Sequence, residues 1–216
     1  MKKLKDPVSG FTHFLGSLAA VAALVFLIVR SCNPEKPWHI VSFSIYGAGM
    51  LLSYTASTVY HWLNLSENNT LRLRRIDHMM IFIFIASTYT PICLIPLWGG
   101  WGWTLFGLVW ATALAGIIMK TVWMDAPRRL TTIIYVFMGW LAVIALVPLY
   151  RAVGFNALTW LFAGGLFYTI GAVIYSRKWP NPFPPVFGFH EIFHLFVILG
   201  SICHFILMVK YVVPLK

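Results

Sequence analysis

The sequence predicts an all-α, polytopic membrane protein with seven transmembrane helices. Two observations support this fold class. Hydrophobic residues make up 60% of the 216-residue chain and charged residues only 10%, and the mean hydropathy is +0.80. A water-soluble globule of this composition would lack a polar surface. In addition, the apolar residues form successive runs close to the roughly 20 residues that a helix needs to cross a bilayer.

Each apolar run is bounded by a short polar or turn-forming segment. The first run, from Phe11, is long and lacks a small-residue cleavage site, so we expect it to remain in the protein as the first helix. The connectors include SCNPEKP, WGG and SRKWPNPFPP, which favour antiparallel neighbours and leave no room for a soluble domain. We expect a single domain, 1–216, with helices at residues 11–29, 40–63, 79–97, 101–120, 130–149, 158–175 and 189–213.

The lysines and arginines predict the orientation, because these residues accumulate on the cytoplasmic side of short loops. The 16 of them divide unequally when the N-terminus is placed inside. The cytoplasmic segments then hold Lys2, Lys3, Lys5, Arg72, Arg74, Arg75, Lys120, Arg128, Arg129, Arg177 and Lys178, and the outer segments hold Arg30, Lys36, Arg151, Lys210 and Lys216. We expect a cytoplasmic N-terminus, an outside C-terminus and a plasma-membrane location, which in a bacterium is the inner membrane.

The net charge of +10 therefore reflects membrane topology. The basic residues lie between apolar runs and form no basic patch with interleaved aromatics, so we expect no nucleic-acid partner. The expected partners are membrane lipids, and a homo-oligomer is left open. Arg72, Arg74 and Arg75 most simply enforce topology and attract anionic lipid head groups. A role in binding a substrate phosphate is the alternative.

The stretch HEIFH, from His190 to His194, matches the H-E-x-x-H pattern in which two histidines on one helix face bind zinc. The expected topology brings two further polar residues to the same depth. His61 closes the second helix, and Asp77 opens the third. Three imidazoles and one carboxylate therefore meet at the cytoplasmic ends of three helices. Polar groups at such positions are costly in a membrane and need a partner or a function.

This set predicts a metal site. Three histidine ligands, His61, His190 and His194, with one open position are typical of catalytic zinc (Zn2+), which lowers the pKa of a bound water to about 7. Asp77 is the candidate base beside that water. Ser57, one helical turn before the first ligand, is a candidate hydrogen-bonding partner. The alternative for each of these residues is an interhelical hydrogen bond, or for the serine simple packing.

A protease is not the favoured interpretation. Positions 197 and 200 are Val and Gly, so the H-E-x-x-H-x-x-G-x-x-H extension is absent. The segment RIDHMM around Asp77 does not resemble the Asp setting of site-two intramembrane proteases. Glu191 lies about 100° around the helix from His190 and need not face the metal.

The other histidines receive weaker expectations. His13, at the inner end of the first helix, is expected to make a structural hydrogen bond, and the alternative is that it approaches the site from the side. His204 is about 20 Å along the helix from His190, too far to share the metal, and is expected to make an interhelical contact or to form part of an outward polar path. His78 follows the candidate base directly and is expected to point elsewhere. His39 is expected in an outer loop.

Three segments taken together resemble the bacterial hemolysin III branch of the progestin and adipoQ receptor (PAQR) family: STVYHWL at 57–63, RIDHMMIFIFIASTYTP at 75–91 and FHEIFHLFVILGSICHF at 189–205. The resemblance extends over nearly the whole chain. It implies a seven-helix membrane protein in which the same three histidines hold zinc and Asp77 positions a water. It also implies kinship with alkaline ceramidases, which hydrolyse a lipid amide.

We therefore predict a zinc-dependent hydrolase that cleaves an amide or ester bond in a lipid and thereby affects membrane lipid homeostasis. In this hypothesis Asp77 is the base and Ser57 steadies the developing oxyanion. The alternative is a non-enzymatic protein, either a sensor or receptor of lipid state or a pore-forming cytolysin (hemolysin). There zinc would lock the helices together. The mainly apolar outer halves of the second, third and seventh helices argue against a constitutive channel.

Overall fold

The computed structural model describes residues 4–184 and 186–215. Seven helical stretches within them are long and apolar enough to cross a membrane, which confirms the predicted fold class. In chain order the elements are α1 (Pro7–Ser31), α2 (Pro37–Trp62), α3 (Glu67–Leu94), α4 (Gly100–Val122), α5 (Arg128–Gly139), the 3₁₀ helix η1 (Leu141–Ala145), α6 (Leu146–Val153), α7 (Phe155–Arg177), α8 (Phe189–Leu207) and the π-helix η2 (Met208–Val212).

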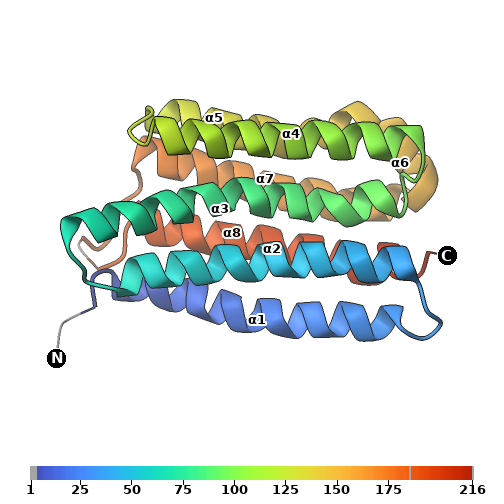
Figure 1. Ribbon diagram of the computed structural model, residues 1–216, viewed down its shortest axis with the longest axis horizontal. Coiled ribbons are helices and arrows are strands. Elements are labelled where there is room, and N and C mark those ends of the chain that lie inside the picture. The colour runs from blue at the N-terminus through green and yellow to red at the C-terminus, as the bar shows by residue number, and fades with distance from the viewer. Residues whose placement is uncertain (1–3, 185, 216) are drawn as a thin grey trace.

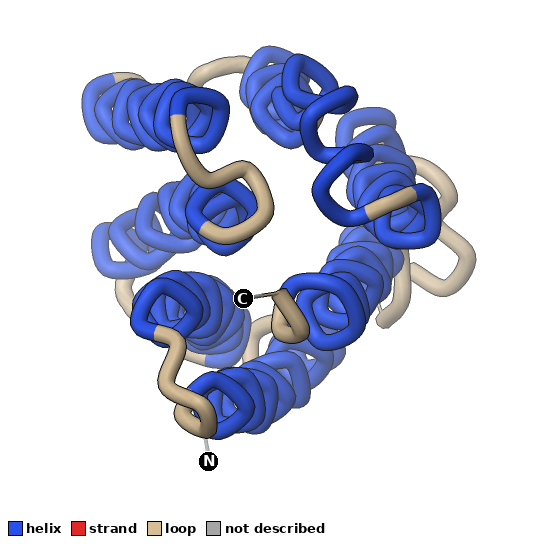
Figure 2. Tube along the Cα trace, turned by 90° about the vertical axis from the view of Figure 1, so that its right-hand side faces the viewer, coloured by secondary structure: helices blue, strands red, loops and turns tan. Residues whose placement is uncertain are grey.

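The spans follow one another around a ring in chain order, and α8 returns to lie beside α1 (Figure 2). The short connectors make neighbours antiparallel. We call the end at which α1, α3, α5 and α8 begin the histidine end, on the left in Figure 1, and the other the opposite end. The N- and C-terminal ends of the described chain lie at the histidine end and the opposite end, respectively (Figure 1).

Local sequence explains where several helices start. Pro7 and Pro37 occupy the first turns of α1 and α2, where a missing N–H costs nothing and the fixed φ suits a helix. The third helix, expected over 79–97, begins already at Glu67. Hydropathy marks only the part that lies in lipid, whereas backbone hydrogen bonds continue through the polar stretch ENNTLRLRR. Asp77 therefore lies inside α3 rather than at its first residue.

The fifth span, expected as one helix over 130–149, is broken into α5, η1 and α6. Pro148 disfavours one continuous helix, because a proline in a helix interior clashes with the carbonyl four residues before it. In the structure Pro148 lies in the first turn of α6, where this clash is avoided. The Tyr89 hydroxyl of α3 donates a hydrogen bond to the Gly139 carbonyl (2.5 Å) and accepts one from the Ala142 N–H (3.0 Å). A neighbouring helix thus satisfies backbone groups that the break exposes.

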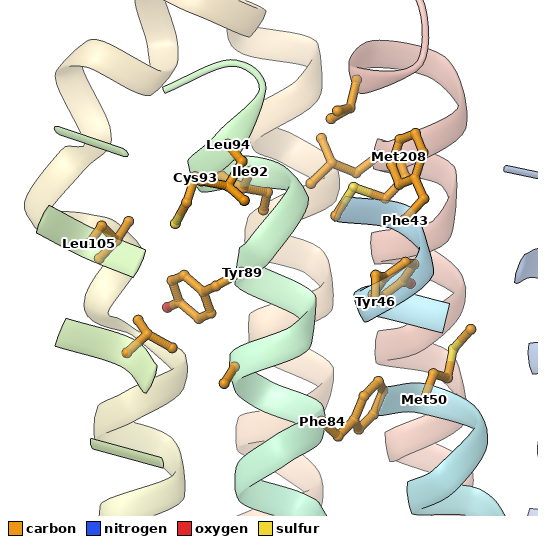
Figure 3. Packing of buried hydrophobic residues seen from close by; sticks show 14 of the residues in the cluster. Phe43, Tyr46, Met50, Phe84, Tyr89, Ile92, Cys93, Leu94, Leu105 and Met208 are labelled. Atoms are coloured by element: carbon orange, nitrogen blue, oxygen red, sulfur yellow. The ribbon is translucent and has the colours of Figure 1, made fainter. Parts of the chain in front are cut away.

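Large apolar side chains fill one side of the ring, between α2, α3, α4 and the last helix (Figure 3). Phe43 and Tyr46 of α2 and Met208 of η2 are fully buried there. Phe84 and Leu105 extend the cluster to α3 and α4. The open space inside the ring lies beside this packing and is bordered mainly by α3, α5, α7 and α8.

Candidate metal centre

A cavity of about 370 Å³ lies inside the ring. Its volume is within the range of small-molecule sites in proteins, about 300–1,000 Å³. The charged side chains that line it lie towards the histidine end, and its deeper part is lined mainly by apolar ones such as Phe84, Ile92 and Leu161, with Thr88 and His204 among them. The cavity is therefore amphipathic along its length, as a site for a lipid would be.

Three histidines meet beside this cavity, which His190 and His194 line directly. His61 lies in the last turn of α2, and His190 and His194 lie one turn apart at the start of α8, on one helix face. Their ligand atoms all lie within 4.8 Å of one another, and the Nε2 atoms of His61 and His190 are 3.1 Å apart. The structure therefore brings together the three predicted ligands in a group that is able to hold a metal ion.

The outward-facing nitrogens of two of these rings are already hydrogen-bonded. His61 Nδ1 lies 3.0 Å from a carboxylate oxygen of Asp6, and His194 Nδ1 lies 3.2 Å from the Ser9 carbonyl. An Nδ1–H that donates outward leaves Nε2 as a lone pair facing inward, which is how proteins orient metal-binding imidazoles. The donor set thus fits a transition-metal ion such as zinc.

Asp6 was not predicted from the sequence. Its backbone N–H donates to the His61 carbonyl (2.8 Å), and Lys5 lies 3.6 Å from its carboxylate and 3.5 Å from the Tyr60 ring. The hydrogen bond with His61 lowers the pKa of Asp6 below its ordinary value, against the opposing effect of burial. Partial burial lowers the pKa of Lys5. The residues before α1 thus hold the Asp6 carboxylate against the end of α2. The sequence showed only that Asp6 precedes Pro7 and gave no sign of its contact with His61.

His13 of α1 lies against the histidine group in an unexpected way. Its ring stacks on that of His194, with centroids 3.6 Å apart and planes 7° apart. Neither of its ring nitrogens has a hydrogen-bond partner in residues 4–184 and 186–215. The expected structural hydrogen bond is therefore wrong. The sequence could not reveal the stacking, because it arises from the return of α8 beside α1.

The Glu191 carboxylate has partners other than the histidine group, in agreement with the expectation that it need not face the metal. It accepts hydrogen bonds from the Ser9 hydroxyl and from the Gly188 N–H, the latter at 2.8 Å. It therefore closes the first turn of α8 and ties it to α1. The glutamate of the H-E-x-x-H pattern is unavailable as a base at the metal, which removes the basis of the protease interpretation.

Asp77 and Ser57 both line the cavity but do not belong to the ligand group. The Ser57 hydroxyl lies beside the Asp77 carboxylate. Their catalytic roles stay predictions. The expectation that His78 points away is wrong, since it lines the same cavity. The cavity is wide enough to reach two successive residues of α3.

The two remaining histidines make contacts between helices. His204 donates from Nε2 to the Leu161 carbonyl of α7 (3.3 Å), which is the interhelical contact predicted. The expected loop position of His39 is wrong. This histidine is buried in α2, because the helix starts at Pro37, and its Nε2 donates to the Val212 carbonyl (3.2 Å).

Fold and site together define a class: a seven-helix membrane protein with a buried three-histidine group beside an internal cavity. A family model described as "Haemolysin-III related" matches residues 1–205. The chain belongs to this haemolysin-III-related family, which confirms the resemblance found in the sequence. It is accordingly a multi-pass membrane protein, located in bacteria in the inner membrane.

Individual relatives agree with this membership. The chain is 39% identical over 214 residues to a "Hemolysin-3 homolog" of Bacillus subtilis (strain 168), covering 99% of this chain and 97% of the relative. It is 35% identical over 211 residues to "Hemolysin-3" of Bacillus cereus, covering 97% and 93%. A more distant relative is "Progestin and adipoQ receptor-like protein 1" of Caenorhabditis elegans, 23% identical over 219 residues, covering 90% of this chain and 49% of that protein.

Proposed function

We propose that this protein is a zinc-dependent hydrolase that cleaves an amide or ester bond in a membrane lipid. One observation carries the proposal: three histidine ligand atoms converge beside an amphipathic internal cavity that also contains a carboxylate and a hydroxyl. When bound, zinc supplies a Lewis acid and lowers the pKa of a water molecule. Such a reaction would alter the composition of the surrounding membrane.

The remaining roles belong to the chain's own residues. Asp6 and the Ser9 carbonyl orient two of the imidazoles through their Nδ1 atoms. The Asp77 carboxylate takes a proton from the attacking water and returns it to the departing amine or alkoxide. Ser57 donates a hydrogen bond to the carbonyl oxygen as negative charge develops on it. The apolar wall of the cavity holds an acyl chain and excludes bulk water.

The first test is metal content measured by mass spectrometry on purified protein, together with turnover on a panel of lipid amides and esters. We expect about one zinc ion per chain, with both zinc and hydrolysis lost in His194→Ala. His39→Ala is the matched control, because that histidine is equally buried but lies at the opposite end. Both properties should survive in it. Wild-type protein without stoichiometric metal would contradict the proposal.

A non-enzymatic role with structural zinc is the second candidate. The observation that favours it is that the histidine group joins α2 to α8, while Asp6 and Ser9 join both to the start of α1. In that case zinc would change stability alone. Zinc-replete protein that leaves every lipid of the panel intact, yet loses thermal stability in His194→Ala, would favour this role over the hydrolase.

The orientation in the membrane is also a proposal, with the histidine end facing the cytoplasm. Cys32 is exposed in the connector after α1, at the opposite end, whereas Cys93 and Cys203 are buried. A thiol reagent that cannot cross membranes should therefore label intact cells through Cys32, and Cys32→Ser should abolish the labelling. If Cys32 is labelled only after the cells are opened, the protein has the opposite orientation, with the histidine end outside.

A further inference from the structure

Three cationic side chains line the mouth of the cavity at the histidine end: Arg74 of α3, Lys120 of α4 and Arg128 of α5. Lys120 is only 2% exposed. Within residues 4–184 and 186–215, none of the three forms an ion pair, since the ion pairs found there all involve Asp6. The mouth thus contains positive charge that no carboxylate of the described chain neutralises directly.

A buried cation without a partner is costly in a membrane protein and marks a functional position. Lys120 makes no hydrogen bond within the described part of the chain, although it borders open space. Two carboxylates line the same cavity. Asp125 is exposed at the rim, and Asp77 lies beside Ser57. Neither comes within ion-pair distance of the cations, so an anionic group bound in the cavity would be their direct partner.

The cations lie close to the candidate metal centre. The Arg128 guanidinium carbon sits 4.5 Å from the centre of the Tyr175 ring, and the same guanidinium donates to the Tyr175 carbonyl (3.3 Å). The Tyr175 ring lies 5.6 Å from that of His190. One aromatic ring therefore separates Arg128 from His190 of the histidine group, while the mainly apolar part of the cavity lies deeper.

We infer that the cavity binds a lipid with a phosphate-bearing, anionic head group. The phosphate lies between Arg74, Lys120 and Arg128, the acyl chain extends into the apolar depth, and the amide or ester bond between them reaches the histidines. Two guanidinium forks and one ammonium suit the several oxygens of a phosphate. The inference rests on the proposed function and names the substrate class for the same site.

Binding measurements on the purified protein in neutral detergent test this inference. The probes are a lysophosphatidic acid, a monoacylglycerol with the same acyl chain, and inorganic phosphate, each followed by calorimetry. We expect the lysophosphatidic acid to bind at least about tenfold more tightly than the monoacylglycerol, and inorganic phosphate to bind far more weakly than either. The same measurements on His194→Ala keep the test separate from hydrolysis, because the phosphate preference should persist there even if no lipid is ever cleaved.

Charge-removing variants locate the site. Lys120→Met should abolish the preference for the phosphate-bearing lipid without changing monoacylglycerol binding, whereas Lys210→Met, exposed at the opposite end, should leave the preference intact. Arg128→Gln, compared with its exposed neighbour in Arg129→Gln, provides a second pair if Lys120→Met does not fold. Equal affinity of the wild type for both lipids, or a preference that survives both Lys120→Met and Arg128→Gln, overturns the inference. Inorganic phosphate binding as tightly as the lysolipid would overturn its assignment to a lipid head group.

Discussion

At the opposite end of the ring, Lys36, directly before α2, and His39 within α2 bind the end of the last helix. The Lys36 ammonium donates to the carbonyls of Val213 (2.8 Å) and Leu215 (2.7 Å), and His39 donates to that of Val212 (3.2 Å). At the histidine end, His61 and His194 contact protein oxygens in this way only through their outward Nδ1 atoms. Buried histidines therefore bind backbone carbonyls at one end, whereas at the other end they keep ring nitrogens that are free to bind a metal.

The difference lies in which donor and acceptor atoms remain free. The last carbonyls of a helix have no partner within it, and cationic donors there also interact favourably with the helix dipole. Lys36 and His39 donate to three carbonyls at this end and so act as structural caps. In the histidine group, the inward nitrogens point at one another across less than 4.8 Å. A buried histidine becomes a candidate ligand through its unused atoms, not through its residue type.

The largest expected effect concerns turnover at the histidine end. Asp77→Asn should lower the turnover number by roughly 10²–10⁴-fold, the usual contribution of a positioned general base, while zinc content stays at the wild-type level. Glu67→Gln, an exposed acid of the same helix, should change neither. Loss of zinc in Asp77→Asn would instead make the carboxylate a ligand, and unchanged turnover would remove its role as base.

A smaller effect is expected for the carboxylate behind His61. Asp6→Ala should weaken zinc affinity by about 10–100-fold, as loss of a hydrogen-bonding partner of a metal ligand usually does. Competition against a chelator of known affinity measures this change. Asp6→Asn, which keeps an acceptor oxygen, should recover part of the loss. Equal zinc affinity in all three proteins would show that the 3.0 Å contact does not orient the imidazole.

In the broken fifth span, the Tyr89 hydroxyl both donates and accepts a hydrogen bond, so it provides a structural contrast to the histidine group. Tyr89→Phe removes the partner of both Gly139 and Ala142, so the free energy of unfolding should fall by about 1–3 kcal/mol. Thermal denaturation in detergent measures the loss, and Tyr150→Phe, an exposed tyrosine of α6, is the control. Zinc content should not change. A variant as stable as the control would mean that water replaces the hydroxyl.

The smallest effect on the metal site is expected at the opposite end. His39→Ala leaves the buried Val212 carbonyl without its donor, and the expected loss of stability is about 1–3 kcal/mol, with zinc content and turnover at wild-type values. Denaturation curves and metal analysis of the same preparation decide the point. Any loss of zinc in His39→Ala would contradict the purely structural role assigned to this end.

Much of the fold follows from local sequence. Runs of apolar residues identify the spans because each must place about 20 residues in lipid, and i, i+4 spacing puts His190 and His194 on one helix face. Hydropathy says nothing about where a helix continues beyond the lipid. It therefore missed the polar start of α3 at Glu67. Nor does it register a break whose backbone groups are satisfied by Tyr89 on another helix.

The sequence by itself thus determined the seven spans, the family and the three histidines expected to meet, because spacing and apolar length are properties of the chain taken locally. Only the tertiary structure decided what surrounds them. The closing of the ring placed Asp6 against His61, stacked His13 on His194 and put Lys120 at the mouth of the cavity. These contacts join residues far apart in the chain, and they depend on how the helices pack around one another.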